Sequence, residues 1–526
     1  MNSMALSPVV DSLLSEIEAD SHTASRSTHA EVSRAVSAFA VLYEKARNAV
    51  EFRADHLVRR AAIERILKRR FLINGGPTAI AESLITELLW ARYIDSALIT
   101  DAKTTTIQAI INRYAQVKHV MDASPHARFL SWDFLTGLAS SEIEETLISG
   151  RKRSALTNFF YQAIRPDITL PGMDEQYVNL LTFIAVERAY SQSDDAILSY
   201  HVLRIMLADW FTTDEQSIEK NWKNFLQVTE MMHKAMRDTN SDALFRYVRK
   251  HAPPFLLLQD FLFETGEKAR GIIEDKAAFE QKLAEIAGVR YHAIGNKVKR
   301  AIVRSFIYIF FTKMIFAFAL EAPYDLLIAK KIAYLPLAVN TLFPPILLIL
   351  VAGLFTVPGA DNTRRLVDRL FTIIYHFDNL KTDTDSFIAI PHVRRPLLST
   401  VFSLFYIATY GITFGLIHYM LSSLHFSIAS QIIFIFFVAL ISFFAYRIRL
   451  SAKEYEMVEH QGILEPLFDF FFLPILRAGH ILSQGIAKIN IFIFLFDFIL
   501  EAPLKVIFDV VEEWIRFVRI KKDEII

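Results

Sequence analysis

The stretch IASQIIFIFFVALISFFAY, residues 428–446, is the clearest indication of the class to which this chain of 526 residues belongs. It holds no charged side chain, and its length is close to the ~20 residues that an α-helix needs to cross a bilayer. Three further apolar stretches of comparable length occupy residues 302–320, 332–355 and 397–421. The sequence therefore predicts a polytopic α-helical membrane protein with a four-helix transmembrane region at residues 296–446.

The composition agrees with long helices and lipid-facing surface. The chain is 53% hydrophobic and has 44 Phe but only 16 Gly, which disfavours turn-rich β-folds. Lys and Arg together number 57 and are balanced by 57 Asp and Glu, so no overall field attracts nucleic acid. The absence of cysteine excludes disulfides, thiolate metal sites and cysteine nucleophiles.

Residues 28–295 show the pattern of a large soluble α-helical domain. Apolar residues at three-to-four spacing predict one long helix over residues 28–73, which a Gly-Gly-Pro sequence at residues 75–77 would end. Asp214 and Ser241 are expected to cap two of the helices that follow. No repeat period is visible, which favours a bundle or an irregular array over a solenoid. These helices are predicted at residues 79–94, 106–121, 141–164, 174–190, 194–210, 214–237, 241–251 and 275–294.

The N-terminus and the basic residues predict the orientation. Residues 1–27, expected to be flexible, offer no export signal because acids interrupt each apolar run. Basic residues would gather on one side of the membrane if the spans form two hairpins joined by the cytoplasmic loop 357–396, with only Lys330 and Lys331 opposite. The pattern predicts a multi-pass protein of the cell membrane with a cytoplasmic N-terminus. The basic residues are Lys297, Lys299, Arg300, Arg304, Arg364, Arg365, Arg369, Lys381, Arg394, Arg395, Arg447, Arg449 and Lys453.

Residues 447–526 are apolar but interrupted by charges such as Asp469 and Asp497. A charge at the bilayer centre costs about 2.5 to 3.5 kcal/mol, so this region is expected to be membrane-associated, with one or two further spans or re-entrant segments. The total is then four to six spans. Residues 503–522 predict an amphipathic helix that lies on the membrane or on a partner.

A six-residue echo, FALEAP at residues 318–323 and FILEAP at residues 498–503, ends two Phe-rich stretches. Proline suits the first turn of a helix, so each copy is expected to mark the end of a membrane helix and the start of an interfacial one. A structural repeat between two halves, as in some transporters, and a coincidence in Phe-rich sequence both remain open. The residues that define the echo are Glu321, Pro323, Glu501 and Pro503.

Catalytic motifs are missing from the sequence. It has no phosphate-binding loop, no GxGxxG, no HExxH and no GxSxG, so neither an enzyme nor a cofactor is predicted. Glu230 and His233 form a single ExxH, whereas a di-iron bundle needs two. The cluster Glu454, Glu456, Glu459 and His460 is better explained as a solvated helix face, and His418, His425 and His480 are scattered.

Lys313 is the best single candidate for a functional intramembrane residue. A lysine within a span usually faces a protein interior, a carboxylate or a water path, and Asp469 or Asp497 would be a suitable partner. Snorkelling of Lys313 to the membrane surface is the competing interpretation. Asn340, beside three prolines of the second span, is a further polar candidate. In the third span Gly411 and Gly415 have GxxxG spacing, which indicates either helix packing or two unrelated small residues.

The densest basic cluster lies at the end of the predicted long helix and comprises Arg59, Arg60, Arg65, Lys68, Arg69 and Arg70. Such a patch suits anionic lipid headgroups or a protein partner. Nucleic acid is disfavoured because no aromatic residues are interleaved for base stacking. The alternative is a bundle surface whose charges are matched by acids elsewhere.

The favoured function is that of an interaction scaffold or assembly platform at the membrane, because the cytoplasmic helical domain is large and free of motifs. A transporter or channel component that uses Lys313 and the proline-broken second span is the alternative. An enzyme acting on lipid ranks last. The expected partners are the lipid bilayer and proteins bound through the cytoplasmic domain, and a homo-oligomer is compatible with the sequence.

Overall fold

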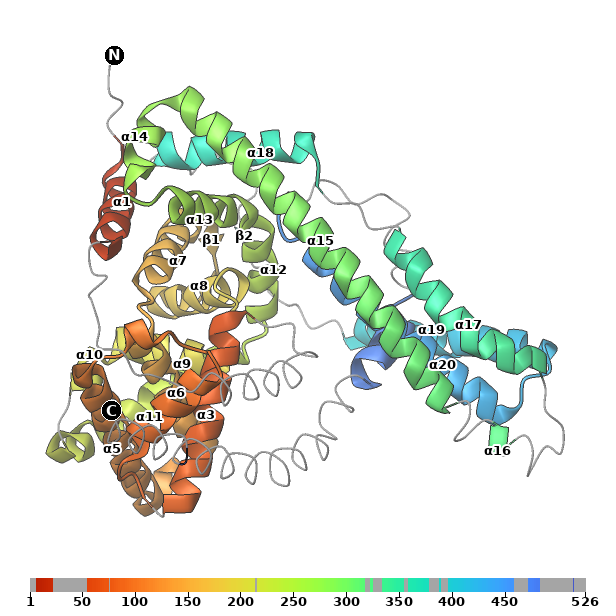
Figure 1. The fold of residues 1–526 in the computed structure, drawn as a ribbon, viewed down its shortest axis with the longest axis horizontal. Coiled ribbons are helices and arrows are strands. Elements are labelled where there is room, and N and C mark those ends of the chain that lie inside the picture. Colours follow the sequence, from red (N-terminus) through yellow and green to blue (C-terminus); the bar gives the residue numbers. More distant parts are fainter. Residues whose placement is uncertain are drawn as a thin grey trace, which may run out of the picture. The chain divides into compact units, whose positions relative to one another are not determined.

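The computed structural model describes residues 6–21, 54–74, 76–212, 215–316, 322–324, 334–353, 358–377, 387–388, 396–457, 472–482 and 514. The chain divides into two compact units. The N-terminal unit comprises Met1–Asp275, Leu370–Ala389 and Ala502–Ile526, and the C-terminal unit comprises Lys276–Arg369 and Ile390–Glu501. Apart from one pair of two-residue strands, the regular structure of the described residues is helical (Figure 1), which confirms the all-α prediction.

In the N-terminal unit α6 packs against α3, α5 and α9, while α8 packs against α7, α9, α11 and α12. Leu135, Leu138 and Ile143 of α6 are fully buried, and a Cβ at Gly137 would lie 3.1 Å from that of Ala196 on α9. The helices are α1 (Pro8–Ser21), α3 (Asp55–Asn74), α4 (Ile80–Trp90), α5 (Asp101–Ala123), α6 (Trp132–Leu147), α7 (Arg151–Ile164), α8 (Glu175–Ala189), α9 (Asp195–Met206), α10 (Ala208–Thr212), α11 (Glu215–Met236), α12 (Ser241–His251), α13 (Pro253–Thr265) and α14 (Ala269–Glu274), with 3-10 turns η1 (Ser96–Leu98), η2 (Pro125–Ala127), η3 (Arg165–Asp167) and η4 (Gly266–Lys268).

Side chains cap the N-termini of several of these helices, among them α5 and α9. Thr100 accepts from the amide of Lys103 at 3.3 Å, and Asp194 accepts from that of Ile197 at 3.1 Å. Ser241 was expected to be a cap, but it is the first residue of α12, and its hydroxyl accepts a hydrogen bond from Arg188 at 3.4 Å. Asp214 lies outside the described residues.

Two predictions about the N-terminal unit were wrong. The N-terminus was expected to be flexible, but residues 8–21 form α1, because apolar residues one and two turns apart give it a buried face. The helix predicted at residues 141–164 is divided between α6 and α7 at Gly150.

Part of the predicted loop 357–396 belongs to the N-terminal unit. Strand β2 (Phe387–Ile388) pairs in parallel with β1 (Ile168–Thr169). The hydroxyl of Tyr375 donates to the carbonyl of Ile273 at 2.5 Å. The loop also contains α18 (Ala360–Tyr375), an amphipathic helix that was not predicted.

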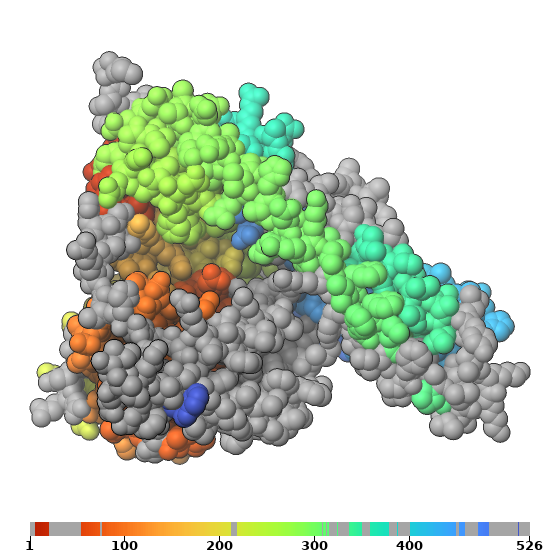
Figure 2. Space-filling model, viewed as in Figure 1, coloured from red at the N-terminus to blue at the C-terminus, as the bar shows by residue number. Residues whose placement is uncertain are grey.

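The C-terminal unit has a core of three helices, α15 (Lys276–Phe316), α17 (Tyr334–Gly353) and α20 (Ile428–Ala452), which pack against one another. Figure 2 shows the side chains of α15 and α17, both in green tones, in contact along this unit. Ile309, Leu348, Phe437 and Ile441 form the buried centre. The other described helices of this unit are α16 (Ala322–Tyr324), α18 as far as Arg369, α19 (Pro396–Ser423) and a short helix at Phe472–Leu482.

Helix α15 runs without interruption through the predicted domain boundary at residues 295 and 296. Separate helices were expected at residues 275–294 and 302–320, but Gly295 and Asn296 between them do not end α15. The boundary between the compact units instead falls between Asp275 and Lys276. With 41 residues at ~1.5 Å each, α15 is about 60 Å long.

Contacts inside the C-terminal unit define helix directions. Asn340, early in α17, donates to the carbonyl of Ser430, early in α20, so these two helices run parallel. The side-chain amide of Asn362 donates both to Tyr291, early in α15, and to the carbonyl of Tyr455, just after α20. Tyr291 thus lies near the C-terminal end of α20. Lys313, late in α15, contacts Phe437, which precedes Tyr455 in the sequence. Helices α15 and α20 are therefore antiparallel.

Two helices among the described residues are long and apolar enough to cross a membrane, Thr400–Ser423 and Ile428–Ile448. They coincide with the third and fourth predicted spans. The first predicted span is described only as far as Phe316, and the apolar part of the second, Pro336–Ile349, is shorter than a span. Four spans are therefore not confirmed.

Candidate functional site

Lys313 lies inside the three-helix core of the C-terminal unit. Its side chain is fully buried, and its Nζ is 5.1 Å from the ring centroid of Phe437, within the range of a cation–π contact. Phe437 lies near the centre of the apolar stretch Ile428–Ile448. The ammonium group is thus at mid-length of α20, which disfavours snorkelling. Asp469 and Asp497, the expected partners, lie outside the described residues.

Asn340 is the second buried polar side chain of this core. Its Nδ2 donates to the carbonyl of Ser430 at 3.1 Å. Asn340 contacts α20 at Ser430, and Lys313 contacts it at Phe437, seven positions later. The two contacts are therefore about 10 Å apart along the axis of α20. Pro344 and Pro345, further along α17, lie within a continuous helix and are buried.

Gln431 links α19 to α20 beside their connecting turn. Its Oε1 lies 2.6 Å from Nδ1 of His418, and its Nε2 donates to the hydroxyl of Ser422 and to the carbonyl of Phe426, both at 3.1 Å. Sequence reasoning missed this cluster, although a glutamine within an apolar span was a visible signal. In an apolar medium such hydrogen bonds join helices.

The glycine pair Gly411 and Gly415 does not mediate packing between the helices that the structure describes. A Cβ at either position would meet nothing within 4 Å among the described residues. The close approach occurs at Gly479 of the helix Phe472–Leu482, where a Cβ would overlap the carbonyl of Ala439 on α20. Of the repeated boundary motif, Pro323 lies in α16, while Glu321, Glu501 and Pro503 lie outside the described residues.

The basic cluster of α3 is paired within the N-terminal unit. Most of its members contact acids of other helices, and Arg65 is half-buried on the same helix. This arrangement favours the structural interpretation over lipid binding, because little of the charge remains for headgroups. The ion pairs are Arg59 with Glu144 at 2.7 Å, Arg60 with Asp194 at 2.6 Å and with Glu64 at 2.7 Å, Lys68 with Glu64 and Asp133 at 2.7 Å, Arg70 with Glu87 at 2.7 Å, and Arg69 with Glu87.

A buried acid of α6, Glu142, forms a further ion pair. Glu142 pairs with Arg113 of α5 and accepts from the hydroxyl of Tyr114 at 3.1 Å. Burial raises the pKa of Tyr114 well above its usual value, and the neighbouring Glu142 adds to this effect. The network therefore holds α5 against α6, with a tyrosine that stays protonated as a hydrogen-bond donor.

A second buried cluster, around Glu187, was not predicted. Nδ1 of His201 lies 3.0 Å from Glu187, and the hydroxyl of Ser193 donates to the same carboxylate at 2.5 Å. Burial alone would raise the pKa of Glu187, but His201 and Ser193 hold it below its usual value. Burial lowers the pKa of the nearby His56 to about 3, assisted by Arg153. Because Ser193 donates to a carboxylate and not to a histidine, the cluster lacks the geometry of a serine nucleophile.

The residues described in the structure contain no group of three His, Asp or Glu that could hold a metal ion. Glu230 is exposed, and His233 packs edge-on against Phe129 and Phe134, with ring centroids 6.0 and 5.4 Å away. Burial lowers the pKa of His233, which fits a packed histidine. In the other acidic cluster Glu456 pairs with Lys453 at 2.9 Å, while Glu459 and His460 lie outside the described residues.

Comparison with known proteins gives no match: no protein family, no curated protein and no solved structure is similar to this chain. A proposal for its function therefore rests on the geometry of the two units.

Proposed function

We propose that the chain is a multi-pass membrane protein whose N-terminal unit is a cytoplasmic interaction platform. The observation that carries the membrane part is the exposure of α19. Only 6% of its apolar window is buried, and Phe402, Phe405 and Ile407 are 64, 60 and 65% exposed. Apolar surface costs about 25 cal/mol per Å² in water. The core helix of a soluble protein would be buried, whereas lipid tails are a suitable surrounding for α19.

Two contacts support a hairpin topology. The pairing of β1 with β2 supports a loop after α17 on the same side of the bilayer as the N-terminal unit. The bond from Asn362 of α18 to Tyr455 supports a return of the chain to the level of that loop after α20. Each of the segments α15 to α17 and α19 to α20 then crosses the bilayer an even number of times. Basic residues at these positions favour the cytoplasm.

The internal pairing of charges supports the platform part of the proposal. Arginines of α3, α5 and α9 bind acids of α6, so that one central helix is held from three directions. Such a network holds the helices in fixed positions, as a docking surface requires. Helix α15 would then begin outside the bilayer at Lys276 and continue into it without interruption.

Two measurements on the full chain test this proposal. The chain should stay in the membrane pellet after alkaline carbonate extraction, and release into the supernatant would contradict membrane insertion. Crosslinking mass spectrometry on intact membranes should then capture the same defined proteins through residues 54–275 in repeated experiments. Capture only through the C-terminal unit would contradict the platform.

A transporter or channel component is a second candidate, favoured by Lys313. A fully buried ammonium at the middle of an apolar helix is the kind of group that marks ion and substrate paths. If this holds, purified protein in liposomes should pass ions or solutes, and Lys313→Ala should abolish the flux while Lys313→Arg, which keeps the charge, retains part of it. Wild-type liposomes without flux would exclude this candidate.

A further inference from the structure

Helix α1 covers an apolar groove of the N-terminal unit. Its buried residues Val10, Leu13, Leu14 and Ile17 are at most 4% exposed, and their spacing of three, one and three residues places them on one face. This face packs against α7 and against the turn η4. The contact is that of an amphipathic helix in a groove, a recurrent mode of peptide recognition.

The charge of Arg270 beside the groove favours an acidic helix. Arg270 donates to Glu18 at 3.1 Å and to the hydroxyl of Ser15 at 3.3 Å, and it also binds Asp11. Residues 8–21 contain four acids and no basic residue. An acidic helix with carboxylates seven residues apart therefore fits both the apolar groove and the arginine beside it.

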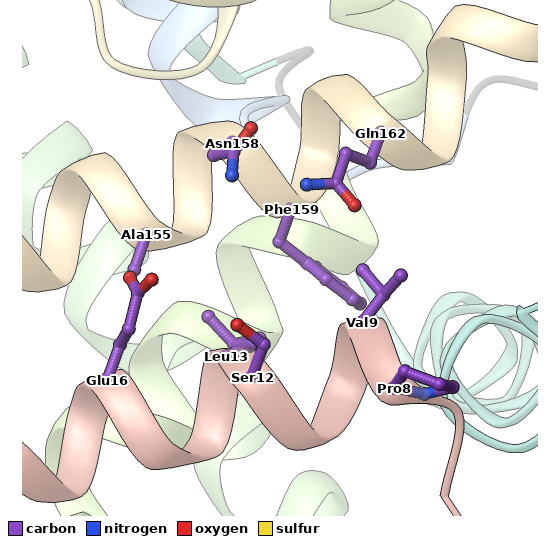
Figure 3. Close-up of a pocket in the computed structure, with 9 residues that line it drawn as sticks. All are labelled: Pro8, Val9, Ser12, Leu13, Glu16, Ala155, Asn158, Phe159 and Gln162. Carbon is purple, nitrogen blue, oxygen red and sulfur yellow. The ribbon is translucent and has the colours of Figure 1, made fainter.

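An open pocket of about 210 Å³ lies beside the buried face, between α1 and α7. Its polar lining comes from Ser12 and Glu16 on α1 and from Asn158 and Gln162 on α7 (Figure 3). Polar side chains of both helices therefore border the apolar contact, as they do at the rim of an interface.

We propose that the groove formed by α7 and η4 is a binding site for an acidic amphipathic helix of a partner protein, and that α1 is its intramolecular occupant. The partner presents apolar residues in the pattern of residues 10, 13, 14 and 17, with carboxylates at the places of Asp11 and Glu18. It binds when α1 leaves. Residues 22–53 connect α1 to α3, and the local effective concentration of α1 makes it a strong competitor.

The first experiment uses a fluorescent peptide of residues 6–21 and the full chain in detergent. The chain lacking residues 1–21 should bind this peptide saturably, at least about tenfold more tightly than the full chain, because the attached helix competes. Arg270→Glu should weaken binding, and a peptide with Asp11→Lys and Glu18→Lys should restore it. A peptide with Leu13→Asp and Leu14→Asp is the matched control and should not bind. Absence of saturable binding to a folded truncated chain overturns the proposal.

A second experiment avoids truncation. Because the chain has no cysteine, Ser12→Cys and Asn158→Cys can be joined by a short bis-maleimide. The joined full chain should not bind the peptide, while the unjoined variant should bind it as the wild type does. Equal binding to both forms overturns the proposal even if the truncated chain does not fold.

The inference gives the proposed platform a docking site and in that sense rests on the proposed function. The peptide experiments measure binding in the groove, whereas carbonate extraction measures membrane insertion. The two can therefore fail separately.

Discussion

The two units treat polar groups in opposite ways. In the N-terminal unit buried carboxylates such as Glu87 and Glu142 bind arginines of neighbouring helices, and the surface carries the remaining charge. In the C-terminal unit α19 presents apolar side chains outward, while Asn340 and Gln431 are buried and bind backbone carbonyls. This difference is what we expect if, as proposed, the N-terminal unit lies in water and the C-terminal unit in a bilayer.

The largest expected effect comes from breaking a buried ion pair in the N-terminal unit. The carboxylate of Glu87 is 2% exposed and binds both Arg69 and Arg70. Glu87→Gln should lower the free energy of unfolding by about 3 to 5 kcal/mol, because two arginines lose their counter-charge. Urea unfolding followed by tryptophan fluorescence measures this, since Trp90, Trp132, Trp210 and Trp222 lie in that unit.

Asp122→Asn is the matched control for Glu87→Gln. Asp122 pairs with Lys118, but its side chain is 53% exposed. Its loss should change the free energy of unfolding by at most about 1 kcal/mol. Equal effects of the two substitutions would contradict the view that the N-terminal unit depends on buried pairs.

Acid should destabilise the N-terminal unit through His56. The folded chain holds the pKa of His56 at about 3, below its usual value of 6.5, so the unfolded chain binds more protons between these values. The free energy of unfolding should therefore fall as pH drops below ~6.5, by up to about 1.4 kcal/mol per pH unit. His56→Gln should flatten this slope in urea titrations, whereas the exposed His119→Gln should leave it.

His201 and Glu187, which lie near His56, change the free energy of unfolding with pH in other ways. Burial would lower the pKa of His201, but Glu187 raises it. The stabilisation of the fold by protonated His201 is therefore complete below pH ~6.5 and is lost as pH rises through the raised pKa of His201. The lowered pKa of Glu187 gives a contribution that is lost only in stronger acid. The free energy of unfolding between pH 6.5 and 4.5 therefore reports on His56, whereas the contribution of His201 changes only above pH ~6.5. A wild-type free energy of unfolding that does not fall between pH 6.5 and 4.5 would contradict the role of His56.

Packing in the C-terminal unit should depend on Gly479 and not on the GxxxG pair. Gly479→Ala should cost about 1 to 3 kcal/mol, because the new Cβ overlaps the carbonyl of Ala439. Gly411→Ala should stay within about 0.5 kcal/mol, because its Cβ enters open space. Thermal unfolding in detergent compares the two variants. A larger loss for Gly411→Ala would point to packing against another copy of the chain.

The smallest effect is expected at Lys68, at the rim of the basic cluster. Its side chain is 34% exposed, although it contacts both Glu64 and Asp133. Lys68→Met should change the free energy of unfolding by at most about 1 kcal/mol. Arg60→Met, at 7% exposure, should cost clearly more in the same urea experiment. Equal costs would remove the distinction between buried and exposed pairs.

Sequence periodicity predicted the helices whose apolar residues are regularly spaced. Helix α12 has the expected bounds, and α20 begins at the expected Ile428. The short helices α1 and α18 were missed, since their charged residues obscured an apolar face that spacing alone would have revealed. The continuity of α15 was missed because composition changes near residue 300 while the helix does not end there.

The pairing of charges could not be predicted from the sequence. Arg60 and Asp194 are separated by more than a hundred residues, so only the fold brings them together at 2.6 Å. A dense basic run consequently resembled a lipid-binding patch. The sequence singles out Lys313 as a candidate, but the contact of its side chain with Phe437 depends on the antiparallel packing of α15 and α20.

Insertion of the C-terminal unit into a bilayer as two hairpins is the central claim, and cysteine accessibility in intact cells tests it most directly. The natural chain has no cysteine, so single substitutions give a clean signal. Leu424→Cys, at the turn between α19 and α20, should react with a membrane-impermeant maleimide added outside. Asp122→Cys, in the N-terminal unit, should react only after permeabilisation. Reaction of both positions from the same side would contradict the topology.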